Sequence, residues 1–128
     1  MKKILITGGS GFIGTNFINY LSKFKIKIVN IDKISQVSTP EKFKKILNKK
    51  NYSFIKYNLN NSEKILQILK KEKPDFIVNF AAESHVDRSI SDPLYFIKNN
   101  IHLSMNLFLA YAKYQKIKKA KFFQISTD

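Results

Sequence analysis

The chain contains no cysteine, and none of its apolar runs approaches the length of a membrane span. Without cysteine there is no disulfide framework, no thiolate nucleophile and no cysteine metal site. A membrane helix needs roughly 18–20 consecutive apolar residues. The apolar stretch at residues 4–6 runs into Gly8 and Gly9 instead of a signal-peptide cleavage site. We therefore expect a cytoplasmic protein without a membrane segment, and we expect no metal site.

Acidic residues are few: 23 Lys and Arg stand against 9 Asp and Glu, which gives a formal net charge of +14. Such an excess invites a nucleic-acid partner. All the basic residues except Arg88 are Lys, and they are spread along the chain, with denser groups on expected helix surfaces. A solvated surface explains that distribution, so the sequence predicts no nucleic-acid partner. With 128 residues, 44% of them hydrophobic, the chain resembles one folded domain.

Short apolar runs alternate with stretches of helical periodicity along the whole chain. The apolar runs predict strands at residues 3–7, 26–31, 52–57, 75–80 and 121–125. Helices are expected over residues 12–24, from Thr39-Pro40, from a cap at Ser62 to Pro74, and from Asp92-Pro93 to about Tyr114. Strands separated by helices pair in parallel through right-handed crossovers. The sequence thus predicts an α/β fold over residues 1–128, a doubly wound (Rossmann) parallel sheet in the order 3-2-1-4-5.

The expected long helix is apolar on two opposite sides at 3.6 residues per turn. One stripe consists of Ile97, Ile101, Met105, Phe108 and Ala112, and the other of Leu103, Leu107, Tyr111 and Tyr114. One side would pack on the sheet. The other side would meet another helix or a second subunit, and we favour a homodimer.

A glycine-rich turn joins the first expected strand to the first expected helix. It fits G-x-x-G-x-x-G from Gly8 to Gly14 and G-x-G-x-x-G from Gly9 to Gly14, in the strand–turn–helix context that these patterns require. Its glycines let the backbone approach a pyrophosphate, and the helix N-terminus offers free N–H groups. Asp32 ends the second strand, where a carboxylate can accept the ribose hydroxyls of an adenosine and repel a 2′-phosphate. The sequence therefore predicts NAD as cofactor, and the alternative is a tight turn without a ligand.

Two further segments follow strands four and five, where ligands of such sheets bind. Ala81 and Ala82 are small and suit the close passage of a nicotinamide ribose, and polar side chains follow at residues 83–88. After strand five, Thr127 can bond a sugar hydroxyl, and Asp128 can donate a proton if burial raises its pKa. An ordinary solvated loop is the alternative for the polar segment after strand four.

These segments carry a resemblance to known families. The run from Ile6 to Gly14 resembles the extended short-chain dehydrogenase/reductases. The run Ala81-Ala82-Glu83-Ser84-His85-Val86-Asp87-Arg88-Ser89 is far narrower and resembles the dTDP-glucose 4,6-dehydratases. Ser126-Thr127-Asp128 resembles the start of the Ser-Thr-Asp-Glu-Val-Tyr-Gly motif of that family. The resemblance covers the whole chain, but only the first third or so of a family member.

The resemblance implies an NAD-dependent lyase that acts on dTDP-glucose. Hydride leaves C4 for NAD⁺, water is lost across C5–C6, and hydride returns to C6, which gives dTDP-4-keto-6-deoxy-glucose. The resemblance implies that Asp128 protonates the leaving hydroxyl, and that Thr127 and Ser84 contact the substrate. The NAD site is expected at Gly8, Gly11, Phe12, Ile13, Gly14, Asp32, Lys33, Ser35, Asn58, Leu59, Phe80, Ala81, Ala82, Ser84 and Asn99.

The sequence departs from the family pattern at several places. Asn58-Leu59 replaces the usual Asp-Ile, the segment around Ser35 differs, and Asn99 replaces a common Thr. The Glu that follows Asp128 in the family, and its later Tyr-x-x-x-Lys pair, lie beyond the chain. We therefore expect an N-terminal fragment that ends before the later strands and the substrate domain and has no turnover of its own. Another nucleotide-sugar epimerase or dehydratase, or a non-catalytic NAD-binding module, are the alternatives.

Overall fold

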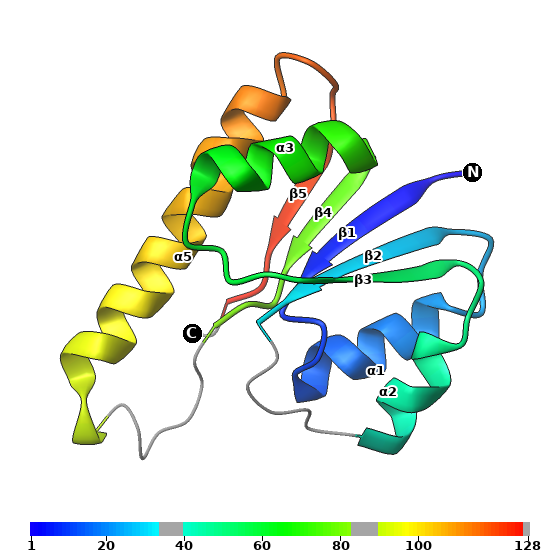
Figure 1. The fold of residues 1–128 in the computed structure, drawn as a ribbon, viewed down its shortest axis with the longest axis horizontal. Helices are drawn as coiled ribbons and strands as arrows, with labels where there is room; N and C mark the ends of the chain where they lie inside the picture. Colours follow the sequence, from blue (N-terminus) through cyan, green and yellow to red (C-terminus); the bar gives the residue numbers. More distant parts are fainter. Residues whose placement is uncertain (34–39, 83–89, 127–128) are drawn as a thin grey trace.

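The computed structural model describes residues 1–33, 40–82 and 90–126 (Figure 1). Its strands are β1 (Lys3–Thr7), β2 (Lys27–Asp32), β3 (Tyr52–Lys56), β4 (Phe76–Asn79) and β5 (Lys121–Gln124). Its helices are α1 (Phe12–Leu21), α2 (Pro40–Leu47), α3 (Ser62–Glu72) and α5 (Pro93–Tyr114). The predicted alternation of strands and helices is confirmed, with ends that differ by a few residues.

All the strands lie in one parallel sheet in the order β3-β2-β1-β4-β5, as predicted. β1 is central and pairs with β2 on one side and β4 on the other, so the strand order reverses between β1 and β4. In sheets of this kind, ligands bind beyond the carboxyl ends of the strands at that reversal. The two carboxyl ends meet there, because Thr7 of β1 pairs with Asn79 of β4.

Helices cover both faces of the sheet, with α1 and α2 on one face and α3 and α5 on the other (Figure 1). Side chains alternate in direction along a strand, so each strand contributes to two cores. The core beside α1 and α2 is built from Ile4, Ile6, Ile18, Ile28, Ile46 and Val78. The larger core beside α3 and α5 includes Leu5, Val29, Ile31, Ile65, Leu69, Ile77, Leu103, Leu107 and Tyr114. Burial on both faces explains why the strands are apolar nearly throughout.

The helix starts show which capping signals the sequence gives reliably. α5 begins after Asp92, whose side chain accepts a hydrogen bond from the Tyr95 N–H at 3.0 Å, as the Asp-Pro start predicted. For α3 the predicted cap at Ser62 is wrong, because Asn61 holds the cap position and accepts from the Lys64 N–H at 3.0 Å. Both residue types are good caps, and the extended backbone of Asn61 decides between them.

The two apolar sides of α5 have different surroundings, as the sequence predicted. Leu103 and Leu107 are buried in the core beside α3. Ile97, Ile101 and Met105 on the other side remain 54%, 58% and 53% exposed. Across the part of the chain that the structure describes, no helix combines the length and apolar character needed to cross a membrane.

β5 forms one edge of the sheet. Its Phe122 packs against Phe108 and Tyr111 of α5, with ring centroids 4.9 Å apart in both pairs. Phe123 points to the opposite face of the sheet and is 48% exposed. The edge strand is therefore covered on the α5 side and open on the other.

Candidate functional site

All four glycines of the chain lie between the end of β1 and the first turn of α1. Gly8 has a φ of +70°, and a Cβ there would lie 2.6 Å from the backbone N of Ala81. A Cβ on Gly14 would lie 2.6 Å from the Gly8 carbonyl oxygen. A Cβ on Gly11 would lie 3.4 Å from the Gly8 carbonyl oxygen, which is an ordinary van der Waals contact. The packing requires glycine at positions 8 and 14, whereas at position 11 the described residues leave room that a ligand can use.

The N–H groups within the turn are bonded to the chain itself. Gly9 donates to Asn30 Oδ1 at 3.1 Å, and Ser10 donates to Asp32 Oδ2 at 2.9 Å. Gly11 donates to a carbonyl oxygen within the turn at 3.2 Å. These bonds tie the turn to the end of β2 and fix its shape.

Among the described residues, no side chain caps the N–H groups in the first turn of α1. First-turn N–H groups have no partner within a helix. Gly11 occupies the cap position without a side chain, and no acidic residue stands in that turn. α3 and α5, by contrast, begin with the side-chain caps Asn61 and Asp92. The N–H groups of Phe12 and Ile13, together with the positive end of the helix dipole, form a place for an anion.

The Ser10 side chain is a second, independent indication of a binding site at this turn. The residue is 0% exposed, and its Oγ has no hydrogen-bond partner within the described ranges. The Nδ2 of Asn99 on α5 is a further buried polar atom without a partner there. Buried polar groups are nearly always hydrogen-bonded, so each of these atoms has capacity for a bound molecule.

Asp32 stands beside the glycine turn, as predicted. It ends β2, and its carboxylate accepts the Ser10 N–H described above. β2 neighbours β1, so the carboxylate lies on the β2 side of the switch between β1 and β4. The spacing of Asp32 from the turn in the sequence becomes a direct contact in the fold.

The buried amide of Asn30 fixes the position of the glycine turn. Asn30 of β2 is 0% exposed and, besides holding Gly9, donates from Nδ2 to the Tyr52 hydroxyl at 3.0 Å. Burial raises the pKa of Tyr52 to about 12, while the hydrogen bond from Asn30 opposes the shift. The phenol therefore stays neutral at physiological pH, and the support for the turn does not titrate there.

The other predicted site residues fall into four groups. Phe12 and Ile13 are 64% and 63% exposed, and Asn58 and Ala82 are also exposed. Leu59 has its side chain in the core, 4% exposed, so only its backbone can face a ligand. Partly buried positions are Lys33, Phe80 and Ala81. Ser35, Ser84, Thr127 and Asp128 lie outside the described residues, and their roles stay predictions.

Sequence reasoning missed three buried polar residues beneath the site, Thr7, Asn30 and Asn79, which are at most 1% exposed. Each stands in or ends a strand whose other buried residues are apolar. A polar residue within such a run was the available signal, because burial requires a partner for it.

A family model described as GDP-mannose 4,6 dehydratase matches residues 5–128. The chain belongs to this family. The predicted resemblance to dTDP-glucose 4,6-dehydratases is also confirmed. A Dictyostelium discoideum protein named dTDP-D-glucose 4,6-dehydratase is 41% identical over 130 residues, which is 100% of this chain and 29% of that protein.

Solved structures give the same result for the fold. The dTDP-glucose 4,6-dehydratase of Bacillus anthracis, solved in complex with NAD, matches with a TM-score of 0.81 and 32% identity. That match covers 99% of this chain and 38% of the other. The UDP-glucose 4-epimerase of Thermotoga maritima, solved with UDP-glucose, matches with a TM-score of 0.80 and 28% identity over 98% of this chain and 38% of the other. The chain spans 29–40% of the length of the curated relatives it matches.

Two residue pairs in the chain have the Tyr-x-x-x-Lys spacing that the resemblance places in a later segment. The Tyr114 hydroxyl is buried and donates to the Pro74 carbonyl at 3.1 Å, before the start of β4 and thus at the amino edge of the sheet. Tyr52 is the first residue of β3 and accepts a hydrogen bond from Asn30, whereas Lys56 lies on the same face but at the other end of the strand. Burial raises the pKa of both tyrosines to about 12. Neither pair is arranged as a catalytic base at the carboxyl edge.

Proposed function

We propose that residues 1–128 form the NAD-binding part of a nucleotide-sugar dehydratase. The observation that carries the proposal is the open first turn of α1 beside the Asp32 carboxylate. A pyrophosphate would be held by the Phe12 and Ile13 N–H groups, and the adenosine ribose by Asp32. The room at Gly11 and the unpartnered Ser10 Oγ fit such a ligand. The NAD complex of the Bacillus anthracis relative supports the same cofactor here.

The carboxylate of Asp32 favours NAD over NADP. It can accept both ribose hydroxyls, and it would repel a 2′-phosphate at the same place. Lys33 follows it directly but is partly buried. We therefore expect the binding preference to depend on Asp32.

Titration calorimetry with NAD, NADP and ADP tests the cofactor site. Asp32→Asn should weaken NAD binding by more than about tenfold, or about 1.4 kcal/mol, and narrow the difference between NAD and NADP. Glu63→Gln is the matched control, because it removes one exposed carboxylate from the start of α3 and should leave both affinities unchanged. If the chain binds no NAD, or if Asp32→Asn binds it normally, the proposal is wrong.

We further propose the 4,6-dehydration of dTDP-glucose as the reaction, on the support of the relatives' names. Bound NAD would supply the acceptor for hydride from sugar C4 and the donor of hydride to C6. A ketone at C4 acidifies the C5 proton, so the loss of water must follow the oxidation. Thr127 would hydrogen-bond the sugar, and Asp128 would donate the proton that leaves with the C6 hydroxyl as water.

Two hybrid proteins separate the dehydratase from its nearest rival. In one, the chain replaces the matching segment of the Dictyostelium dehydratase, and in the other that of the Thermotoga UDP-glucose 4-epimerase. We expect keto-sugar formation by the first hybrid, no epimerase activity of the second, and no turnover by the chain alone. Asp128→Asn in the first hybrid should abolish product while NAD binding persists. An active epimerase hybrid beside an inactive dehydratase hybrid would favour the rival, and two inactive hybrids that bind NAD would favour a non-catalytic binding module.

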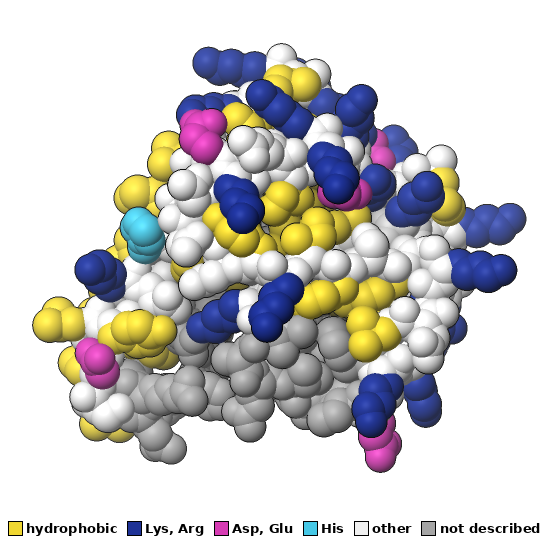
Figure 2. Space-filling view, in the orientation of Figure 1, with side chains coloured by type: hydrophobic (Ala, Val, Ile, Leu, Met, Phe, Trp, Pro, Cys, Tyr) yellow, Lys and Arg dark blue, Asp and Glu magenta, His cyan; other side chains and the backbone are white. Residues whose placement is uncertain are grey.

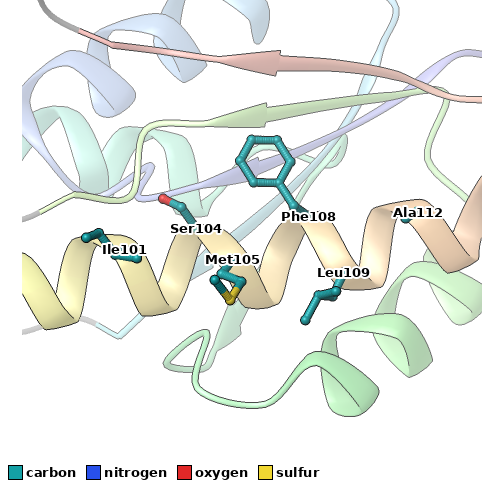
Figure 3. A pocket seen from close by; sticks show the side chains of 6 residues that line it. All are labelled: Ile101, Ser104, Met105, Phe108, Leu109 and Ala112. Carbon is teal, nitrogen blue, oxygen red and sulfur yellow. The ribbon is translucent and has the colours of Figure 1, made fainter.

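We also propose that the exposed side of α5 is a homodimer interface in the complete protein. Ile101, Ser104, Met105, Phe108, Leu109 and Ala112 line a shallow apolar groove there (Figure 3). An apolar stripe of this kind favours a subunit contact. Sedimentation of the active hybrid should show a dimer, and Met105→Lys should convert it to a monomer. A dimer that survives this change would contradict the proposal.

The prediction that no nucleic acid binds has support from the surface. Figure 2 shows the Lys side chains of the described residues spread over the visible face instead of gathered in one band. A specific nucleic-acid site would give an affinity that falls steeply with salt. A cytoplasmic location stays a prediction from the sequence.

A further inference from the structure

Three neighbouring strands carry a row of polar side chains at their carboxyl ends. Thr7 of β1 pairs with Asn79 of β4, and Asn79 pairs with Gln124 of β5. Residues in register on adjacent strands point to the same face of a sheet, here the face covered by α5. Thr7 and Asn79 are 0% and 1% exposed. The row therefore closes the core beside α5 at the edge where the glycine turn begins.

Apolar residues precede this polar row on the same face of the sheet. Two residues earlier along each strand, the same face carries Leu5, Ile77 and Phe122, which belong to or pack on the core. An apolar residue at position 79 would continue this pattern. An amide there requires partners, because a buried amide without hydrogen bonds destabilises the folded state.

Every polar atom of the Asn79 side chain has a partner. Its Oδ1 accepts from the Thr7 hydroxyl and from the Ala81 N–H, the latter at 3.0 Å. Its Nδ2 donates to Gln124 Oε1 at 2.8 Å, and Gln124 Nε2 donates to the Ile125 carbonyl at 3.0 Å. The donors on one side and the acceptor on the other fix the orientation of the amide.

These partners stand where three segments leave the sheet. Thr7 directly precedes Gly8, Ala81 follows β4, and Gln124 and Ile125 lead to residues 126–128. The first two exits also touch, since a Cβ on Gly8 would lie 2.6 Å from the Ala81 N. A change in the amide would move the exits relative to one another.

We propose that Asn79 is a positioning residue for the half of the dinucleotide that lies beyond the pyrophosphate. This inference rests on the proposed NAD site. With the adenosine ribose at the end of β2 and the pyrophosphate at the end of β1, the other half must run over the ends of β4 and β5. Asn79 accepts a hydrogen bond from the Ala81 N–H and donates one to Gln124 at the end of β5. It therefore positions the backbone against which that half of the dinucleotide lies.

A purely structural role and a positioning role of Asn79 predict different changes in the affinities for ADP and NAD. ADP reaches only the glycine turn and Asp32, whereas NAD also reaches the β4 and β5 exits. Loss of stability alone lowers the folded fraction and affects both ligands equally. A positioning role weakens NAD and spares ADP, so the ratio of the two dissociation constants is the readout.

The test measures both dissociation constants by calorimetry for Asn79→Leu, Gln124→Leu and Gln124→Glu. We expect Asn79→Leu to weaken NAD by about tenfold or more and ADP by less than about twofold. Gln124→Leu should weaken NAD by a smaller factor. Gln124→Glu retains the acceptor for Asn79 Nδ2 and should restore most of the NAD affinity.

Gln124 is exposed, so its variants are expected to fold even if Asn79→Leu does not. Tyr114→Phe is the control, because it removes a buried hydrogen bond at the opposite edge and should leave the ratio unchanged. Equal weakening of NAD and ADP, or no weakening of either, would overturn the role of Asn79 while the NAD site stands. Failure of the unchanged chain to bind either ligand would instead remove the NAD site, and this inference with it.

Discussion

The amino and carboxyl edges of the sheet differ in whether their polar groups are paired within the described part of the chain. At the amino edge, Lys3 Nζ lies 3.0 Å from Glu72 Oε2, and Lys118 Nζ lies 3.0 Å from Asp75 Oδ1. The Lys3 N–H also donates to Asp75 at 2.8 Å. At the carboxyl edge, α1 begins without a side-chain cap, and the buried Ser10 Oγ has no partner in the described part of the chain. One edge is closed by the chain's own charges, whereas the other keeps donors for a ligand.

The largest expected effect separates two glycines of the same turn. Gly8→Ala should destabilise the fold by about 3 kcal/mol or more, because it combines a positive φ with a backbone clash. Gly11→Ala should cost less than about 1 kcal/mol in stability. It should nevertheless weaken NAD binding by more than about tenfold, because the added methyl takes the room assigned to the pyrophosphate. Urea unfolding and NAD titration of both variants measure the two effects.

The distinction between Gly8 and Gly11 is wrong if Gly8→Ala and Gly11→Ala have the same effects on stability and NAD binding. Equal loss of stability would mean that Gly11 is also required by the packing of the chain. Normal NAD binding by Gly11→Ala would place the pyrophosphate elsewhere.

The next effect concerns the closed edge. Asp75→Asn removes the charge that meets Lys3 and Lys118 and should cost about 1–2 kcal/mol at neutral pH. The hydrogen bond from the Lys3 N–H, and then that from Lys118, lower the pKa of Asp75 from its ordinary value of 3.8. Its stabilisation is thus present above pH 3.8 and is lost as the pH falls through the lowered pKa of the folded state.

Unfolding curves at several pH values check this prediction. The difference in unfolding free energy between the unchanged chain and Asp75→Asn should shrink in acid, while NAD affinity at neutral pH stays the same. A loss of NAD affinity would show that the amino edge is coupled to the ligand site.

The sequence predicted the sheet order and the place of Asp32 at the end of β2, because both follow from local patterns and the rules of parallel sheets. The hydrogen bond between Asp32 and Ser10 came from the structure. It could not distinguish Gly11 from Gly8, since the difference lies in what surrounds each Cβ position. It also could not find the partners of Asn79. Thr7 is 72 positions away in the chain, and only the register of β1 and β4 brings the two side chains together.

The start of α3 sharpens the comparison with the open start of α1. Asn61→Ala should destabilise the chain by about 1 kcal/mol, because the Lys64 N–H loses its acceptor. Ser62→Ala, at the position that the sequence favoured, should change stability by no more than a few tenths of a kcal/mol. Thermal unfolding of the two variants measures this difference. The reverse order would restore Ser62 as the cap.

The smallest effect is expected at the exposed pair of Glu63 and Lys113, which joins α3 to α5. The hydrogen bond from Lys113 lowers the pKa of Glu63. Both side chains are more than half exposed, at 62% and 53%, and water and salt screen their attraction. Glu63→Gln should therefore leave the thermal midpoint nearly unchanged at low and high salt. A shift as large as that of Asp75→Asn would mean that an exposed ion pair stabilises the fold as much as the ion pairs of the amino edge do. The amino and carboxyl edges of the sheet would then differ only in the uncapped N–H groups at the start of α1.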